Sequence, residues 1–323
     1  MSRNISKGVV IIYFPAVTEG FSAPSVASLY FTDRYLFTIY PFLKKKRPES
    51  LIKYVMELYP DKQVMVDSGV YSLMYKNQLI EEDDLILYTH QYLEMLDRLN
   101  FKGILIEVDS QYIEEEYGTI DTLRTLYPEY GVEDRVLYVW HFAEGLDALW
   151  GLMEKYKRIA LSPKELWMYL KDRKQQKEYK SKALNLFKHM QKRSDNHHFH
   201  LLGTMLDWTA HLPHNWTCDA SSWTSGLVWG FYFLDSPFGF DFRGEKENVS
   251  PAIKRKVDEA MPELLRIYEN VPRFHKKKAI REDALYKMSI SMLSMVEWFK
   301  AETLRRFGDY PIPNDPINFK GKG

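Results

Sequence analysis

The feature that most constrains the fold is the regular return of short, β-rich apolar runs along the chain. Eight such runs occupy residues 9–13, 35–40, 63–66, 103–108, 135–140, 158–161, 198–202 and 216–218. Most are followed by a segment with the apolar spacing of a helix. These segments are 49–58, 81–99, 113–126, 144–156 and 163–192. Strands that alternate with helices predict a parallel sheet with helices packed on it.

Eight strand–helix units favour closure into a (β/α)8 TIM barrel, with an open, doubly wound sheet as the alternative. After Gly226 the pattern changes to a stretch rich in Gly, Phe and turn residues, followed by two long amphipathic segments, 251–270 and 280–307. We therefore expect an α/β barrel over residues 1–230 and a helical C-terminal extension, 231–323, that packs on it.

The overall charge is balanced, because 44 Lys and Arg residues match 44 Asp and Glu residues. No global field attracts the chain to nucleic acid, so any such binding must come from local patches. The single cysteine, Cys218, excludes an internal disulfide and a zinc site built on several thiolates. No run of 18 apolar residues occurs. We expect a cytoplasmic protein with no membrane partner; its oligomeric state is not specified.

Several predicted strands end on polar residues. In a barrel of this kind the working side chains lie at the carboxyl ends of the strands. The third, fourth and eighth runs end at Asp67, Asp109 and Asp219; the fifth ends at His141 and the seventh at Gly203. An aspartate at such a place also serves as a helix N-cap. Three aspartates at one end of a barrel nevertheless favour a shared site.

Glu107 precedes Asp109 by two residues on the fourth run, so the two carboxylates are predicted to share a strand face. If that face is the barrel interior, Glu107 is a buried acid that needs a partner. The alternative is that Glu107 faces the helical layer and meets a Lys or Arg there.

The order of these motifs resembles that of the tRNA-guanine transglycosylase superfamily. "DSGVYS" at 67–72 is similar to the Asp-Ser-Gly-Gly-Phe signature of that family. An aspartate then ends the fourth strand, "RIALSP" and "LLGTM" stand where the family has glycine-containing strand ends, and Asp219 stands where it has its nucleophile. The resemblance runs from about residue 9 to residue 226.

The resemblance implies cleavage of an N-glycosidic bond. Asp219 would attack C1′ of the target nucleotide and form a covalent glycosyl–enzyme intermediate, while Asp67 would act as general acid and base. Asp109 would hydrogen-bond the edge of the base. Further substrate-binding residues would be Ser68, Gly69, Tyr71, His141, Gly203 and Trp223. No cofactor and no metal are expected.

Departures from the family pattern point to DNA more than to tRNA. Members that act on tRNA carry a zinc site of three cysteines and a histidine after the barrel, and this chain has no cysteine there. "ASSWTSG" after Asp219 resembles the phage and genomic-island branch, which inserts deazaguanines into DNA, and related DNA glycosylases. We expect base exchange, with a free modified base as second substrate; the alternative is excision that leaves an abasic site, as in anti-phage defence.

Two basic clusters are candidates for binding the nucleic-acid backbone around a flipped base, although solvated charges need no function. They are Lys44, Lys45, Lys46 and Arg47, and Lys276 and Lys277 within a longer basic stretch. His198 and His200 share a strand face; a polar strand edge is favoured over a metal pair. Cys218 is expected to point away from the site.

Two other classes of function stay open. One is a non-catalytic barrel that binds nucleic acid, which needs neither Asp67 nor Asp219. The other is an unrelated barrel hydrolase that acts on small sugars, which the balanced overall charge would suit.

Overall fold

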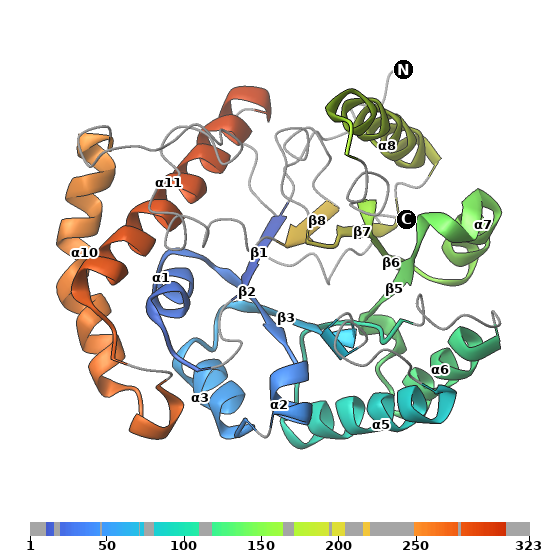
Figure 1. Cartoon of the computed structure of the whole chain (residues 1–323), viewed down its shortest axis with the longest axis horizontal. Coiled ribbons are helices and arrows are strands. Elements are labelled where there is room, and N and C mark those ends of the chain that lie inside the picture. Colours follow the sequence, from blue (N-terminus) through green and yellow to red (C-terminus); the bar gives the residue numbers. More distant parts are fainter. Residues whose placement is uncertain are drawn as a thin grey trace.

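The computed structural model describes residues 11–15, 20–45, 47–70, 72–73, 81–109, 118–163, 171–193, 196–203, 216–219, 249–276 and 279–307. Within them, eight parallel strands pair in chain order and β8 pairs with β1, which closes the sheet into a barrel (Figure 1). The strands are β1 (Ile11–Pro15), β2 (Arg34–Thr38), β3 (Gln63–Asp67), β4 (Ile104–Ile106), β5 (Val136–Trp140), β6 (Arg158–Leu161), β7 (His198–Leu201) and β8 (Trp216–Asp219). The predicted parallel α/β sheet is confirmed.

Helices surround the strands (Figure 1). They are α1 (Ala23–Phe31), α2 (Tyr40–Lys44), α3 (Ser50–Leu58), α5 (Glu82–Arg98), α6 (Gly118–Glu129), α7 (Gly145–Lys155), α8 (Arg173–Arg193), α10 (Pro251–Asn270) and α11 (Glu282–Phe307), with short 3-10 turns η1 (Glu133–Arg135), η2 (Phe142–Glu144) and η7 (Arg273–His275). A helix is described between each pair of successive strands up to β7. The connection from β7 to β8, residues 204–215, lies outside the described residues.

Two apolar layers result from the alternation of side chains along the strands. The layer inside the barrel, here the inner cluster, consists of Tyr13, Leu36, Met65, Ile104, Ile106, Leu137, Val139 and Ala160. The other layer joins the outer faces of the strands to the helices and is much larger. Cys218 belongs to this outer layer and is fully buried, which confirms that it points away from the barrel interior.

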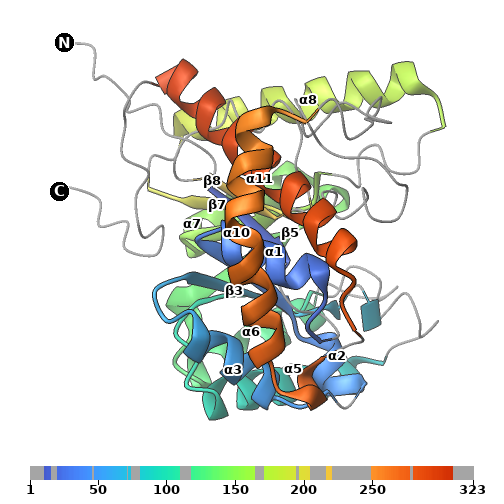
Figure 2. The ribbon, with the colours of Figure 1, turned by 90° about the vertical axis from the view of Figure 1, so that its left-hand side faces the viewer.

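The C-terminal helices pack on the barrel through α1. Helix α11 contacts both α1 and α10, and the two long helices cross one another beside α1 (Figure 2). Their positions agree with the two predicted amphipathic segments. The proposed boundary between residues 230 and 231 lies outside the described residues, so the division into two parts stays a prediction. Among the described helices, none is long and apolar enough to cross a membrane.

Helices α1, α2 and α8 differ from the sequence-based prediction; α2 is a short helix after β2 that was not predicted. Helix α1 was not predicted, because Ser25 and Ser28 interrupt its apolar spacing although both are buried. Helix α8 begins at Arg173, whereas the predicted helical segment begins at residue 163. There the Asp172 carboxylate accepts a hydrogen bond from the Lys174 amide at 2.7 Å, which satisfies a free N–H group at the helix end.

Candidate active site

The carboxyl end of the barrel carries polar side chains that continue the inner cluster. Met65 of β3 and Val139 of β5 belong to that cluster. Two residues further along each chain, Asp67 and His141 therefore point to the same side. On β8, Asp219 pairs in register with an inner-cluster residue of β1. The strands thus bring Asp67, His141 and Asp219 to one end of the barrel, as the sequence predicts.

Asp67 is held by two hydrogen bonds and has a perturbed acidity. Thr38 donates its hydroxyl to Oδ2 at 3.2 Å, and the Gly69 amide donates to Oδ1 at 3.0 Å. Burial, helped by the charges of Asp219 and Asp109, raises the pKa of the Asp67 carboxyl to about 6, against the two hydrogen bonds. The charges of Asp109 and Asp219 therefore lie close enough to act on the Asp67 carboxyl.

Asp219 has donors gathered on one of its oxygens. The His200 ring nitrogen Nε2 lies 3.3 Å from Oδ1, and the Gly203 amide donates to the same oxygen. The Asp219 side chain keeps 16% of its surface exposed, whereas His200 is fully buried. Both of these contacts thus fall on Oδ1 of Asp219.

Behind Asp219 a polar column runs into the barrel interior. The Thr217 hydroxyl lies 2.8 Å from His200 Nδ1 and 2.8 Å from His198 Nε2. Burial lowers the pKa of His198 well below its usual value, and the neighbouring His200 and Arg158 lower it further, so His198 is neutral. The expectation that these histidines lie on a polar strand edge is wrong, because β7 is paired on both sides in a closed barrel.

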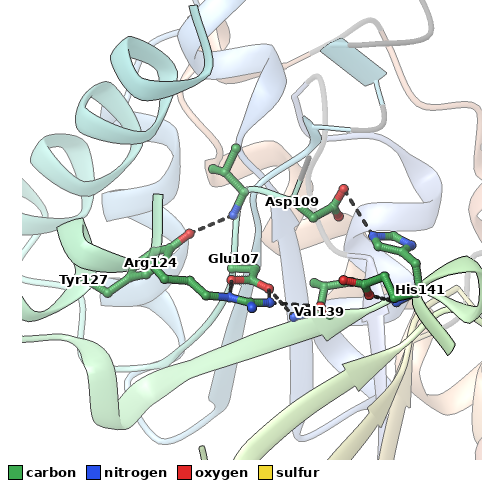
Figure 3. Close-up of polar contacts among 8 residues, drawn as sticks. Glu107, Asp109, Arg124, Tyr127, Val139 and His141 are labelled. Atoms are coloured by element: carbon green, nitrogen blue, oxygen red, sulfur yellow. Dashed lines mark hydrogen bonds and ion pairs between the residues drawn. The ribbon is translucent and has the colours of Figure 1, made fainter. Parts of the chain in front are cut away.

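Asp109 faces His141 across the ends of β4 and β5. Their closest atoms, Asp109 Oδ1 and His141 Nε2, are 3.5 Å apart (Figure 3). The His141 amide donates to Glu144 Oε2 at 2.6 Å, which anchors the chain where β5 ends. Asp109 and His141 thus form a second polar pair at the end of the barrel that carries Asp67.

Glu107 does not lie in the barrel interior, so that expectation is wrong. It is fully buried against α6, where Arg124 donates to both of its oxygens at 2.8 and 3.1 Å (Figure 3). Burial lowers the pKa of the Arg124 guanidinium, but the Glu107 carboxylate more than offsets this, so the pKa is raised. The alternative, an arginine partner in the helical layer, is confirmed. Alternation along β4 places Glu107 on this outer side, because Ile104 and Ile106 face the interior. The predicted face shared with Asp109 is lost because β4 ends at Ile106, and Asp109 meets His141 instead.

Glycines hold both proposed catalytic acids. Gly69 and Gly203 have φ values of +70° and +53°, a region that disfavours residues with a Cβ. A Cβ on Gly69 would also lie 2.7 Å from the Cβ of Tyr40. Each glycine offers its amide to an aspartate at the barrel end, so the backbone there is shaped around the two carboxylates.

The first basic cluster lies beside this end of the barrel. Lys44 is exposed, and its Nζ lies 5.5 Å from the centre of the Tyr88 ring. The Tyr88 hydroxyl donates at 2.6 Å to the carbonyl of Ser68, which is buried next to Asp67. Lys45 is exposed as well, and Arg47 is partly buried.

The second basic cluster lies next to the start of α1. The backbone of Lys276 forms an isolated parallel β-bridge with Phe21, and the Lys276 Nζ donates a hydrogen bond to the Glu269 carbonyl at 3.1 Å. Four predicted site residues lie outside the described part of the chain: Tyr71, Trp223, Lys46 and Lys277.

Sequence reasoning missed the role of the polar column. His198 and His200 were noted only as neighbours on one strand face, and Thr217 was not singled out. The available signal was the position of Thr217, two residues before Asp219 and on the same face of β8. Within the part of the chain that the structure describes, no group of three or more His, Cys, Asp or Glu side chains could hold a metal ion.

Comparison with family models and with curated proteins gives no match for this chain. The likeness to the tRNA-guanine transglycosylase superfamily therefore rests on the short motifs and their order.

Proposed function

We propose that the protein cleaves an N-glycosidic bond in nucleic acid, with Asp219 as nucleophile and Asp67 as general acid and base. The observation that carries the proposal is a difference between the two carboxyls: the pKa of Asp67 is raised to about 6, whereas Asp219 has both of its donors on Oδ1. Two carboxyls in different environments can divide the nucleophile and proton-transfer roles of a double-displacement reaction at a sugar carbon. We further propose that the barrel is a complete (β/α)8 TIM barrel.

Asp219 is arranged to attack with one oxygen. An ionised carboxylate only accepts hydrogen bonds, so His200 Nε2 carries the proton and donates it to Oδ1. His200 Nδ1 must then accept from the Thr217 hydroxyl, which in turn accepts from His198 Nε2. This order of donors occupies Oδ1 of Asp219 and leaves Oδ2 for C1′.

Asp67 is suited to move the proton of the base. With a pKa of about 6, its carboxyl is partly protonated near neutral pH, where general acids work best. As the Asp219–C1′ bond forms and the glycosidic bond breaks, Asp67 protonates the departing base. The resulting carboxylate then takes a proton from the incoming base, which attacks C1′ and releases Asp219.

Asp109 and His141 supply polar groups for the edge of the base. Asp109 accepts hydrogen bonds, and the imidazole of His141 can donate or accept depending on its tautomer. The pair would favour a base that presents a donor edge, as guanine and deazaguanines do. We propose DNA as the substrate and base exchange as the outcome. The residues after Asp219 resemble the branch that modifies DNA, and the C-terminal region lacks the cysteines that members acting on tRNA use to bind zinc.

The test is a covalent trap. Wild-type protein is incubated with single-stranded and duplex DNA that contains guanine or deazaguanine, and adducts are resolved on a denaturing gel. We expect an adduct with the wild type, none with Asp219→Asn, and an unchanged adduct with Asp258→Asn, which removes an exposed acid from α10. An adduct that persists in Asp219→Asn, or its absence on every substrate, would overturn the assignment.

Mass spectrometry of the released bases then separates the two outcomes. Incorporation of an added free base into the DNA supports exchange. Release of a base with an abasic site, whether or not free base is present, would identify the protein as a glycosylase instead.

A further inference from the structure

The start of α8 carries a concentration of positive charge that no part of the proposed reaction uses. Residues 171–182, here the basic arm, contain six basic side chains: Lys171, Arg173, Lys174, Lys177, Lys180 and Lys182. The arm has only two acids. Glu178 pairs with Lys182 at 2.9 Å, and Asp172 accepts the Lys174 amide. Four positive charges are left in excess in a chain whose overall charge is zero.

The basic arm extends beyond the barrel. Helix α8 has 21 residues and is therefore about 30 Å long, whereas the four residues of β7 span only about 13 Å. Its buried residues, Ala183, Phe187 and Met190, all lie in the second half, where Phe187 contacts the Trp216 ring of β8. No residue of 171–182 is buried. Figure 2 shows one end of α8 projecting past the strands.

The arm lies at the end of the barrel that carries the acids. Strand β6 leaves the sheet at its carboxyl end, and α8 must return to the start of β7, which is parallel to β6. The first residues of α8 are therefore at the carboxyl end of the strands, together with Asp67 and Asp219. The exposed Lys44 and Lys45 of the first basic cluster also follow a strand at this end, β2.

We propose that the basic arm binds the phosphate backbone of duplex DNA beside the target nucleotide; the inference rests on the proposed function and assigns to it a docking surface. Exposed Lys and Arg side chains on a helix bind phosphates through charge, without regard to base sequence. A helix that binds a lipid surface needs an apolar face as well. The arm has none, since Tyr179 is its only large apolar residue and is partly buried. These features favour DNA over a membrane.

The test compares two variants that remove three charges each. In the arm variant, Arg173, Lys174 and Lys177 are changed to Gln; in the control, Lys254, Arg255 and Lys256 on the exposed face of α10 are changed to Gln. Binding of a fluorescent 30-base-pair duplex is measured over a range of NaCl concentrations. Each lost phosphate contact lowers the slope of log affinity against log salt by about 0.9, so we expect a reduction of up to about 2.7 in the arm variant and none in the control.

Three results would overturn the proposal: no duplex binding by the wild type, an unchanged slope in the arm variant, or the same reduction in both variants. If the arm variant loses binding to phosphatidylserine vesicles but keeps its duplex binding, the proposal is also overturned, and the arm binds a membrane instead. Adduct formation by the arm variant on a five-nucleotide single strand reports on the barrel chemistry separately from duplex binding. If adducts never form but the slope still changes, the proposed function fails and the arm retains its role.

Discussion

Asp67 is the residue at which stability and chemistry conflict. Its carboxyl is partly buried, and two further carboxylates act on it, so ionisation is unfavourable in the folded protein. Thr38 and Gly69 only partly compensate with their hydrogen bonds. A carboxyl whose pKa is raised towards neutral pH is costly for folding but useful for proton transfer.

The rate of adduct formation should depend on the protonated form of Asp67. Because the pKa of this carboxyl is about 6, the single-turnover rate should be nearly constant below pH 5 and should fall about tenfold per pH unit above 7. The measurement is the rate of adduct appearance from pH 4.5 to 8.5. In Asp67→Asn the rate should be low and lack this fall; a fall of the same shape in the variant would remove Asp67 from the step.

Replacing Asp67 with Asn should stabilise the protein at neutral pH. A carboxyl whose pKa rises from 3.8 to about 6 on folding destabilises the folded state progressively between these values, and fully above about 6. Asp67→Asn should therefore raise the free energy of unfolding by up to about 3 kcal/mol at pH 7.5, with no gain near pH 3. Urea unfolding at the two pH values measures the difference, with Asp258→Asn as control. A gain of equal size at both would contradict the assigned acidity.

The polar column should control the rate of attack more than the binding of substrate. Thr217→Val keeps the shape of the side chain but removes the hydroxyl between His198 and His200, so the His200 ring that contacts Asp219 loses its support. We expect adduct formation to slow by about 10²-fold, with DNA affinity changed less than about twofold. Thr217→Ser, which retains the hydroxyl, should restore most of the rate. Equal loss in both variants would indicate a packing effect instead.

At the scale of elements, α6 completes the sheet where β4 stops. The Glu107 carboxylate accepts the Val139 amide of β5, and Arg124 donates to the Val139 carbonyl at 3.2 Å (Figure 3). The Tyr127 hydroxyl, one turn further along α6, accepts the Val108 amide at 2.8 Å. Side chains of one helix thus bind the backbone that leads to Asp109 and His141.

Removing the arginine of this pair should destabilise the protein strongly. Arg124→Ala leaves the Glu107 charge fully buried without its partner, which costs about 3–5 kcal/mol. The matched control is Arg98→Ala, since Arg98 pairs with Glu49 at a similar distance but is 54% exposed; its loss should cost at most about 1 kcal/mol. Thermal unfolding of the two variants decides. Similar losses would show that burial of the Glu107 pair has no special weight.

How far the sequence predicted the elements depends on the residue pattern in each. The ends of the strands that have continuous apolar runs were predicted to within one or two residues. The positions of Asp67 and Asp219 at the ends of β3 and β8 followed from these predicted ends. The prediction failed where tertiary contacts override pattern. The buried serines of α1 carry no apolar signal. The apolar run to Val108 hides the end of β4 at Ile106, after which Glu107 and Asp109 reach different partners, Arg124 and His141.

At the scale of the whole molecule, a neutral chain is divided into regions of opposite charge. Asp67, Asp109 and Asp219 gather at the end of the barrel, while the basic arm and the lysines after β2 lie towards the same end. Such an arrangement would hold a polyanion at the periphery and present acids to a sugar carbon at the centre. Overall charge hides this because it averages over both regions.

The C-terminal helices should unfold together with the barrel. Leu264 of α10 is fully buried in the apolar layer that also covers the strands, and α10 and α11 both contact α1. Leu264→Ala should cost about 2–5 kcal/mol and lower the melting temperature of a single transition, seen alike by tryptophan fluorescence and by far-UV circular dichroism. Leu87→Ala, at a position that is 55% exposed, is the control and should change stability by less than about 0.5 kcal/mol. A shared apolar layer transmits the loss of one buried side chain to every element that it joins. Two separate transitions, only one of them sensitive to Leu264→Ala, would therefore mean that the helices fold independently of the barrel.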